Sequence, residues 1–430
     1  MPQILNRKTQ PAIQPPGRIH FPQPEIYRLS NGIKVYQFNS GTQDVISIEM
    51  VFTAGSWFQR KPFTAMATNL MLREGTLNYS AQLLSETLDY FGAHFENTTE
   101  RDNAYVTLYS LNKHLDNTLP LLSEIVKNPL FPENEYAVLA GKQRQLLEVN
   151  RQKVNFLART HFNPIIFGKS HPYGMFLEPG DIDKVSHTDL AGFHKDQYHS
   201  GNCTIVVAGL IKPGLMKALD EHFGGTDWSG TPSHREYTKP EASEKKNHFI
   251  LKTGAMQSAI RMGNLMFGRN HADFAGMKVL NAILGGYFGS RLMINLREDK
   301  GFTYGIGSSV VPLLQGGYFV ISGEVGAEVT KEALSEINSE LLRLCNEPVS
   351  ESELSLVRSY LSGEMLRAVD GPFAQAGLYR ELIEADLTMA HFEELIDTVQ
   401  HINAQQLQDL AIKYLSPEKL FTLVVGPEEI

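Results

Sequence analysis

The stretch Phe63–Thr76, "FTAMATNLMLREGT", has the apolar spacing of one amphipathic helix and ends at a Gly-Thr turn. Met66, Asn69, Leu70 and Arg73 are spaced i, i+3, i+4 and i+7, so they lie on one face of that helix. Met66 and Leu70 can only pack, and Asn69 offers one amide, which is a poor metal ligand and no general base. The sequence therefore predicts a helix whose face cannot hold a metal ion.

An internal repeat organises the chain around this helix. "VSHTDLAGFHKDQYHSGNCTIVVAG" begins at Val185 and "VQHINAQQLQDLAIKYLSPEKLFTLVVG" begins at Val399, and both run from Val-x-His through a helical segment to an apolar strand closing on Gly. The segments beginning at Leu121 and Leu341 form a second matching pair in the same order, each with a helix that stops near a proline. Two matches at a similar offset predict duplication of a unit of about half the chain.

The boundary between the two units is predicted at residues 229–246, "SGTPSHREYTKPEASEKK", a polar segment with two prolines that is typical of an exposed linker. We therefore expect an N-terminal domain over 25–228, a C-terminal domain over 247–430, and an extended proline-rich arm over 1–24. Strands and helices mix without strict alternation, which favours an α+β fold with mainly antiparallel sheets. We expect the two homologous domains to face each other across a cleft.

Composition excludes several classes of function. The net charge of −9 argues against a nucleic-acid partner or an anionic membrane surface. Cys203 and Cys345 are the only cysteines and lie in apolar segments, which indicates buried thiols and excludes a disulfide framework. The chain contains no run of 18 apolar residues that could span a membrane, and its N-terminus has no apolar core of signal-peptide type. We expect a cytoplasmic protein, or a periplasmic one if a leader has been removed.

Other catalytic motifs are also missing from the sequence. It contains no Gly-x-Ser-x-Gly nucleophile elbow. The Gly-rich segment Leu284–Ser290, "LGGYFGS", matches neither a P-loop nor a dinucleotide-binding loop. None of the fourteen histidines forms the i, i+3 or i+4 pair that a zinc-binding helix needs. Catalysis by this chain alone is therefore not predicted.

Three short segments give the first half a familiar frame: "NGIKVY" (Asn31–Tyr36), "AGS" (Ala54–Ser56) and "REGT" (Arg73–Thr76). In order and spacing the chain resembles the pitrilysin/insulinase-type zinc peptidases, which include the subunits of the mitochondrial processing peptidase. The resemblance implies the LuxS/processing-peptidase type of metallohydrolase fold. It places Met66, Asn69 and Leu70 where family members carry the His, Glu and His of the zinc motif His-x-x-Glu-His. Glu148 would lie at or near the family's third zinc ligand.

The second half resembles the family more fully. "LGGYFGSRLMINLREDKGFTYGIGSS", Leu284–Ser309, is similar to the family segment that supplies an Arg and a Tyr seven residues apart, which face the zinc across the cleft. They correspond to Arg297 and Tyr304, whose guanidinium and phenol groups suit hydrogen bonding to a peptide carbonyl and its oxyanion. The alternative is an ordinary ion pair for Arg297 and packing for Tyr304. The structural part of the motif comprises Gly285, Gly286, Ser290, Arg291 and Gly301.

The resemblance thus implies a chain that lacks the zinc half of the site and keeps the substrate half. We expect a zinc-free subunit that binds an extended peptide and supplies Arg297 and Tyr304 to a homologous partner, with the zinc held by that partner and no cofactor in this chain. A purely structural core-type subunit is the alternative. A stand-alone hydrolase with a different site is a third hypothesis.

Overall fold

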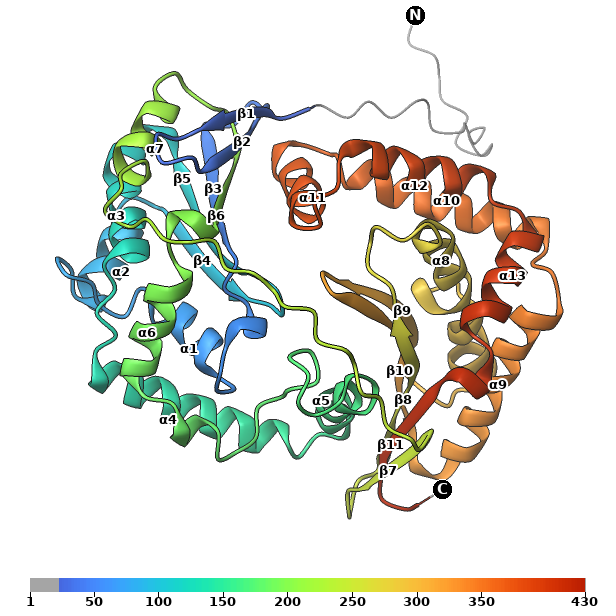
Figure 1. Cartoon of the computed structure of the whole chain (residues 1–430). Coiled ribbons are helices and arrows are strands. Elements are labelled where there is room, and N and C mark those ends of the chain that lie inside the picture. Colours follow the sequence, from blue (N-terminus) through green and yellow to red (C-terminus); the bar gives the residue numbers. More distant parts are fainter. Residues whose placement is uncertain (1–22, 430) are drawn as a thin grey trace, which may run out of the picture.

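The computed structural model describes residues 23–429 and shows an α+β fold built on two sheets, each with its own set of helices (Figure 1). The predicted arm over residues 1–24 lies outside the described residues except for its last two positions. Cys203 and Cys345 are free and buried, as expected.

The N-terminal sheet has six strands in the order β1-β2-β6-β3-β5-β4. Its strands are β1 (Glu25–Arg28), β2 (Lys34–Asn39), β3 (Val45–Phe52), β4 (His94–Thr99), β5 (Ala104–Leu111) and β6 (Cys203–Gly209). The helices of this half are α1 (Thr64–Met71), α2 (Ala81–Tyr90), α3 (Leu115–Lys127), α4 (Glu133–Asn150), α5 (Val154–Phe167), α6 (His187–Gln197) and α7 (Leu215–Phe223). A buried cluster that includes Ile48, Met50 and Phe52 packs one face of the sheet against α1 and the neighbouring helices.

The C-terminal sheet has five strands in the order β7-β11-β8-β10-β9. Its strands are β7 (Asn247–Leu251), β8 (Gln257–Met266), β9 (Ile306–Leu313), β10 (Gly316–Gly326) and β11 (Phe421–Gly426). The helices of this half are α8 (Phe274–Asn281), α9 (Thr330–Asn346), α10 (Glu351–Arg367), α11 (Pro372–Glu384), α12 (Met389–His401) and α13 (Ala404–Tyr414). The outer face, with Ile260, Met262 and Phe319, packs in one buried cluster with residues of these helices.

The two sheets repeat one topology. Strand β6 lies parallel to β2 and antiparallel to β3, and β11 likewise lies parallel to β7 and antiparallel to β8, so the two halves match once the extra edge strand β1 is set aside. Beyond β3 the N-terminal sheet continues with β5 and ends at β4. Beyond β8 the C-terminal sheet continues in the same way with β10 and ends at β9. The repeat found in the sequence corresponds to α6-β6 and α13-β11, and both helices start with a capping box, at Ser186 and Asn403. The structure therefore supports duplication of one unit.

One helix from each half crosses to the other half. Helix α5 follows α4 but packs on β8 and β11 of the C-terminal sheet, whereas α11 follows α10 and packs on β2 and β6 of the N-terminal sheet. Figure 1 shows both helices between the two halves, α11 toward the top of the view and α5 toward the bottom. On one side, Phe162 and Ile166 share a buried cluster with Leu423 and Val425. The inner face of each sheet is therefore covered in part by a helix that belongs to the opposite domain.

The segment predicted as a linker, 229–246, contains no helix or strand, but it is fastened to the N-terminal half. The backbone N–H of Glu241, in this segment, donates to Phe167 O at 2.9 Å. The ring of His171 lies 3.0 Å from Thr238 O and accepts from Tyr173 N at 3.1 Å. The tight loop around His171 thus has a structural use in holding this segment.

Several predicted elements differ in detail from those observed. The helix expected within Phe63–Thr76 ends as α1 at Met71, ahead of Gly75, whose φ of 115° favours glycine. The Gly-rich segment Leu284–Ser290 begins inside a π-helical turn, Ala282–Gly286, that follows α8 directly. In that turn a Cβ on Gly285 would lie 2.5 Å from Ser308 N of β9, so only glycine allows this close approach.

Candidate functional site

The face of α1 that the family frame assigns to zinc has a structural role. Asn69 is buried, and its amide nitrogen donates to the hydroxyl of Tyr198 at 3.0 Å and to Tyr105 O at 3.4 Å. Its main-chain oxygen accepts from the side chain of Asn97. Met66 is half-buried against the N-terminal core. This face joins α1 to β4, β5 and the end of α6, and it carries no metal ligand and no base.

Glu148, expected near the third ligand position, is exposed on α4. Within residues 23–429 there is no cluster of three or more His, Cys, Asp or Glu side chains that could hold a metal ion. A zinc ion at α1 would meet a thioether, a neutral amide and an isobutyl group, so the residues present do not fit zinc.

The second-half motif is held in place by its structural members. Arg291 donates from Nε and a terminal nitrogen to the two carboxylate oxygens of Glu353, at 2.8 Å each. This bidentate pair fixes the segment against α10, since the planar guanidinium matches the carboxylate. Ser290 is buried, and its main-chain oxygen accepts from Ile294 N. These contacts agree with the structural role expected for Ser290 and Arg291.

Arg297 and Tyr304 lie in the same segment, where Arg297 stacks on one aromatic ring and Tyr304 is exposed. Arg297 is half-buried in the π-helical turn Met293–Asp299, and its guanidinium carbon lies 4.4 Å from the ring centre of Phe288. It forms no ion pair or hydrogen bond with any residue in the described range. Tyr304 is 93% exposed in the loop before β9. The alternative, in which Arg297 forms an ordinary ion pair and Tyr304 packs, is therefore not what the structure shows. No hydrogen bond joins the two side chains.

Tyr304 borders a cavity of about 370 Å³ on the inner face of the C-terminal sheet. The polar and charged side chains that line it come from α5, β8, β10 and the loop before β9: Asn155, Gln257, Arg261, Thr303, Tyr304, Ser322 and Glu324. Because Asn155 belongs to the crossing helix α5, both halves of the chain contribute to this cavity.

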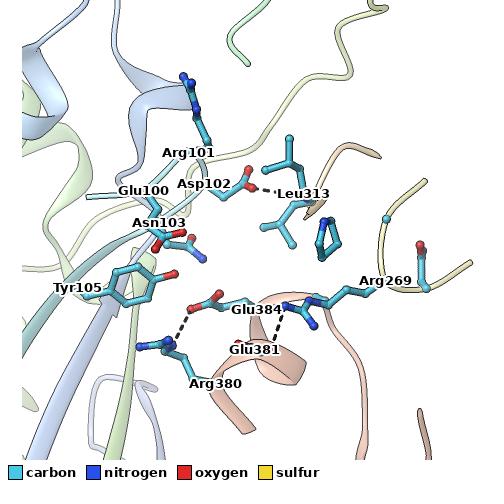
Figure 2. Close-up of a pocket in the computed structure, with 15 residues that line it drawn as sticks. Glu100, Arg101, Asp102, Asn103, Tyr105, Arg269, Leu313, Arg380, Glu381 and Glu384 are labelled. Atoms are coloured by element: carbon cyan, nitrogen blue, oxygen red, sulfur yellow. Dashed lines mark hydrogen bonds and ion pairs between the residues drawn. The ribbon is translucent and has the colours of Figure 1, made fainter. Parts of the chain in front are cut away.

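A second cavity, of about 200 Å³, lies between the halves near α11 (Figure 2). Arg380 of α11 reaches Glu49 of β3 at 2.7 Å, and its guanidinium carbon lies 4.7 Å from the ring centre of Tyr105. Burial raises the pKa of Glu384 to about 7, and the charge of Glu49 adds to this shift, while Arg380 and a hydrogen bond with Tyr105 oppose it. Figure 2 shows the carboxyl of Glu384 directed into the cavity toward Tyr105.

Sequence reasoning did not find this inter-domain group. Glu384 lies in "ELIEAD", which reads as an ordinary amphipathic helix end. No local signal in the sequence shows that α11 crosses to the N-terminal sheet. The sequence therefore gives no link between the four residues of this group, Glu49, Tyr105, Arg380 and Glu384.

The duplicated fold, in which α1 offers no zinc ligands and the second half carries an Arg/Tyr segment, defines a zinc-peptidase-like protein without its zinc site. The model of the insulinase family (peptidase family M16) matches residues 34–164, and the model of the peptidase M16 inactive domain matches residues 184–361. Together these matches cover more than half of the chain, which belongs to the M16 peptidase family.

Named relatives agree with this assignment. The chain is 22% identical over 404 residues to an uncharacterized zinc protease, YmxG, of Bacillus subtilis, covering 93% of this chain and 97% of the relative. It is 23% identical over 453 residues to the beta subunit of the mitochondrial-processing peptidase of Rattus norvegicus, covering 98% of this chain and 88% of that protein. A crystal structure described as the peptidase M16 inactive domain from Pseudomonas fluorescens shares the fold, with a TM-score of 0.87, 24% identity, and coverage of 95% of this chain and 98% of that one.

Among the described helices, none has the length and apolar character needed to cross a membrane.

Proposed function

We propose that this chain is the zinc-free subunit of a heterodimeric zinc metallopeptidase. It would bind an extended peptide and present Arg297 and Tyr304 to the zinc site of a homologous partner subunit. The observation that carries the proposal is the state of these two side chains. Arg297 contacts the ring of Phe288 but has no counterion within residues 23–429, and Tyr304 exposes 93% of its surface.

The chemistry of the pair fits a peptide carbonyl. A guanidinium keeps its charge at every physiological pH and offers a fork of donors, while a phenol donates one directional hydrogen bond. Donors placed where negative charge develops on a carbonyl oxygen stabilise the transition state of acyl transfer. In this chain the two residues would hold and polarise the substrate, while the partner would supply zinc and base.

The peptide would bind in extended form at a sheet edge, where main-chain hydrogen bonds give affinity with little dependence on sequence. Two edge strands are relevant because of their neighbours: β4 packs beside α1, and β9 begins directly after the loop that holds Tyr304. Because only Gly305 separates Tyr304 from β9, a strand added along β9 would pass close to its phenol.

The experiment is reconstitution with a homologous subunit that carries His-x-x-Glu-His. We expect Arg297→Ala and Tyr304→Phe to reduce peptide turnover by about 10²–10³-fold, the usual loss when one oxyanion donor is removed. The complex should remain intact by size-exclusion chromatography. Tyr237→Phe serves as the matched control, because Tyr237 is also well exposed, at 69%, but lies in the segment 229–246.

Two outcomes would reject the proposal. Full turnover by both variants would favour the purely structural subunit. Peptide cleavage by the purified chain without a partner would favour a stand-alone hydrolase.

A further inference from the structure

The duplicated sheets place Glu49 and Arg261 at equivalent positions. Glu49 of β3 pairs with Val206 of β6, and Val206 stands three residues before Gly209, the last residue of β6. Arg261 of β8 pairs with Leu423 of β11, and Leu423 stands three residues before Gly426, the last residue of β11. Both positions face the interior, where the crossing helix of the opposite half covers the sheet.

The two positions differ in how their charge is balanced. Glu49 meets Arg380 of the crossing helix α11 at 2.7 Å. Arg261 instead has no acidic partner, and the positive charge of Arg159, an exposed residue of the crossing helix α5, acts on it. Burial lowers the pKa of Arg261, Tyr318 raises it, and repulsion by Arg159 lowers it. One half thus has an ion pair where the other has two like charges.

No acidic side chain within residues 23–429 compensates for these two charges. Neither Arg159 nor Arg261 forms an ion pair or hydrogen bond there, and Nε of Arg261 is buried without a partner. Arg101, in the β4–β5 turn, adds a third positive charge: burial lowers its pKa, Tyr318, Asp102 and Tyr173 raise it, and Arg159 lowers it. An unpaired buried nitrogen on a cation is costly, so the buried Nε of Arg261 favours an anion that enters from outside.

The cavity beside Tyr304 gives an anion its access. Arg261 lines that cavity together with Gln257 and Asn155, whose side-chain amides can donate hydrogen bonds. Glu324 lines it too, but its carboxylate makes no ion pair with Arg261. The free guanidinium and the expected substrate tyrosine therefore open on the same space.

We propose that Arg261 binds a carboxylate of the extended peptide in the cavity next to Tyr304. This inference rests on the proposed function, since the ligand is the same peptide, and it adds a substrate class: peptides with an acidic side chain or a free C-terminal carboxylate at this position. Arg is suited to the task because its planar fork can hold both carboxylate oxygens.

The test uses the purified full chain and three labelled ten-residue peptides of otherwise identical sequence, measured by fluorescence anisotropy. The first carries one Glu and a C-terminal amide, the second carries Gln and a free C-terminus, and the third carries Gln and an amide. We expect whichever carboxylate is recognised to improve binding about tenfold or more over the third peptide, and Arg261→Gln to abolish that difference. Arg367→Gln, the same charge change on the exposed side of α10, should leave the difference intact.

A second measurement needs no ligand. Because Arg261→Gln removes the repulsion by Arg159, the variant should have a higher Tm than the unmodified chain in the absence of peptide. Equal binding of all three peptides, or a lower Tm with unchanged discrimination, would overturn the carboxylate site while leaving the proposed function standing. Failure of every peptide to bind would count against both.

Discussion

Arg380 and Glu49 form an ion pair of 2.7 Å between residues that are 331 positions apart and lie in opposite halves of the chain. Arg380 is 30% exposed and Glu49 only 15%, so the pair is largely removed from water. It fastens the crossing helix α11 to the N-terminal sheet at the edge of the cavity shown in Figure 2.

Removal of Arg380 should therefore destabilise the whole protein. Arg380→Ala leaves Glu49 and Glu384 without their shared cation, and breaking a buried pair in this way costs about 3–5 kcal/mol. Urea unfolding should show the loss as a lower midpoint. The control is Arg144→Ala, whose partner Asp183 is 60% exposed and whose loss should cost about 1 kcal/mol or less. Equal effects of the two variants would contradict this reading.

Glu384 should make stability depend on pH near neutrality. Its folded pKa is about 7 and its ordinary value is 4.5, so between these values the folded chain keeps a proton that the unfolded chain releases. Stability therefore falls as pH rises from 4.5 to 7, by about 3 kcal/mol at 1.36 kcal/mol per pH unit.

The variant Glu384→Gln cannot ionise and should lose this pH dependence. As pH rises from 4.5 to 8, the unfolding free energy of the variant should increase by about 3 kcal/mol relative to that of the unmodified chain. Denaturant titrations across that range measure it. A difference that stays constant would show that Glu384 titrates in the usual range.

Asn69 should act as a structural residue. Asn69→Ala removes a buried amide that donates to Tyr198 and Tyr105, at an expected cost of about 1–3 kcal/mol. Tyr198→Phe should cost less, and in the double variant the two losses should be non-additive by about 1 kcal/mol. Additive losses from unfolding titrations would argue that the two side chains do not interact.

Gly285 should tolerate no side chain. In Gly285→Ala the new methyl group would lie 2.5 Å from Ser308 N and 2.7 Å from Ser308 Oγ, so either β9 or the π-helical turn must shift. We expect a loss of about 1–3 kcal/mol, as for other overpacked sites. Gly363→Ala, in the open interior of α10, should instead stabilise by about 0.5–1 kcal/mol. If the two variants behave alike in thermal unfolding, the close packing of Gly285 is wrong.

Much of the fold could be predicted because short stretches of sequence determine it. The repeat of Val185 and Val399 marks duplicated helix–strand units, and the Gly-Thr turn after α1 fixes the register that places Met66, Asn69 and Leu70. The residues of the Arg/Tyr motif were found in the same way, and their use by a peptide stays a prediction.

What the sequence could not show is how the halves engage. Helix α11 crosses to the N-terminal sheet and α5 crosses to the C-terminal sheet. Nothing in the periodicity of α5 or α11 says which sheet each covers, because an apolar stripe suits either. The pairing of Arg380 with Glu49, and the repulsion between Arg159 and Arg261, depend on that choice and so became visible only in three dimensions.

The reciprocal crossing of α5 and α11 is the geometry of a swapped dimer whose two subunits have been fused into one chain. Each half, taken alone, would expose the inner face of its sheet and carry a helix with nothing to cover. A break within residues 229–246 should therefore leave two fragments that cannot fold separately but assemble when expressed together, as split reporters do.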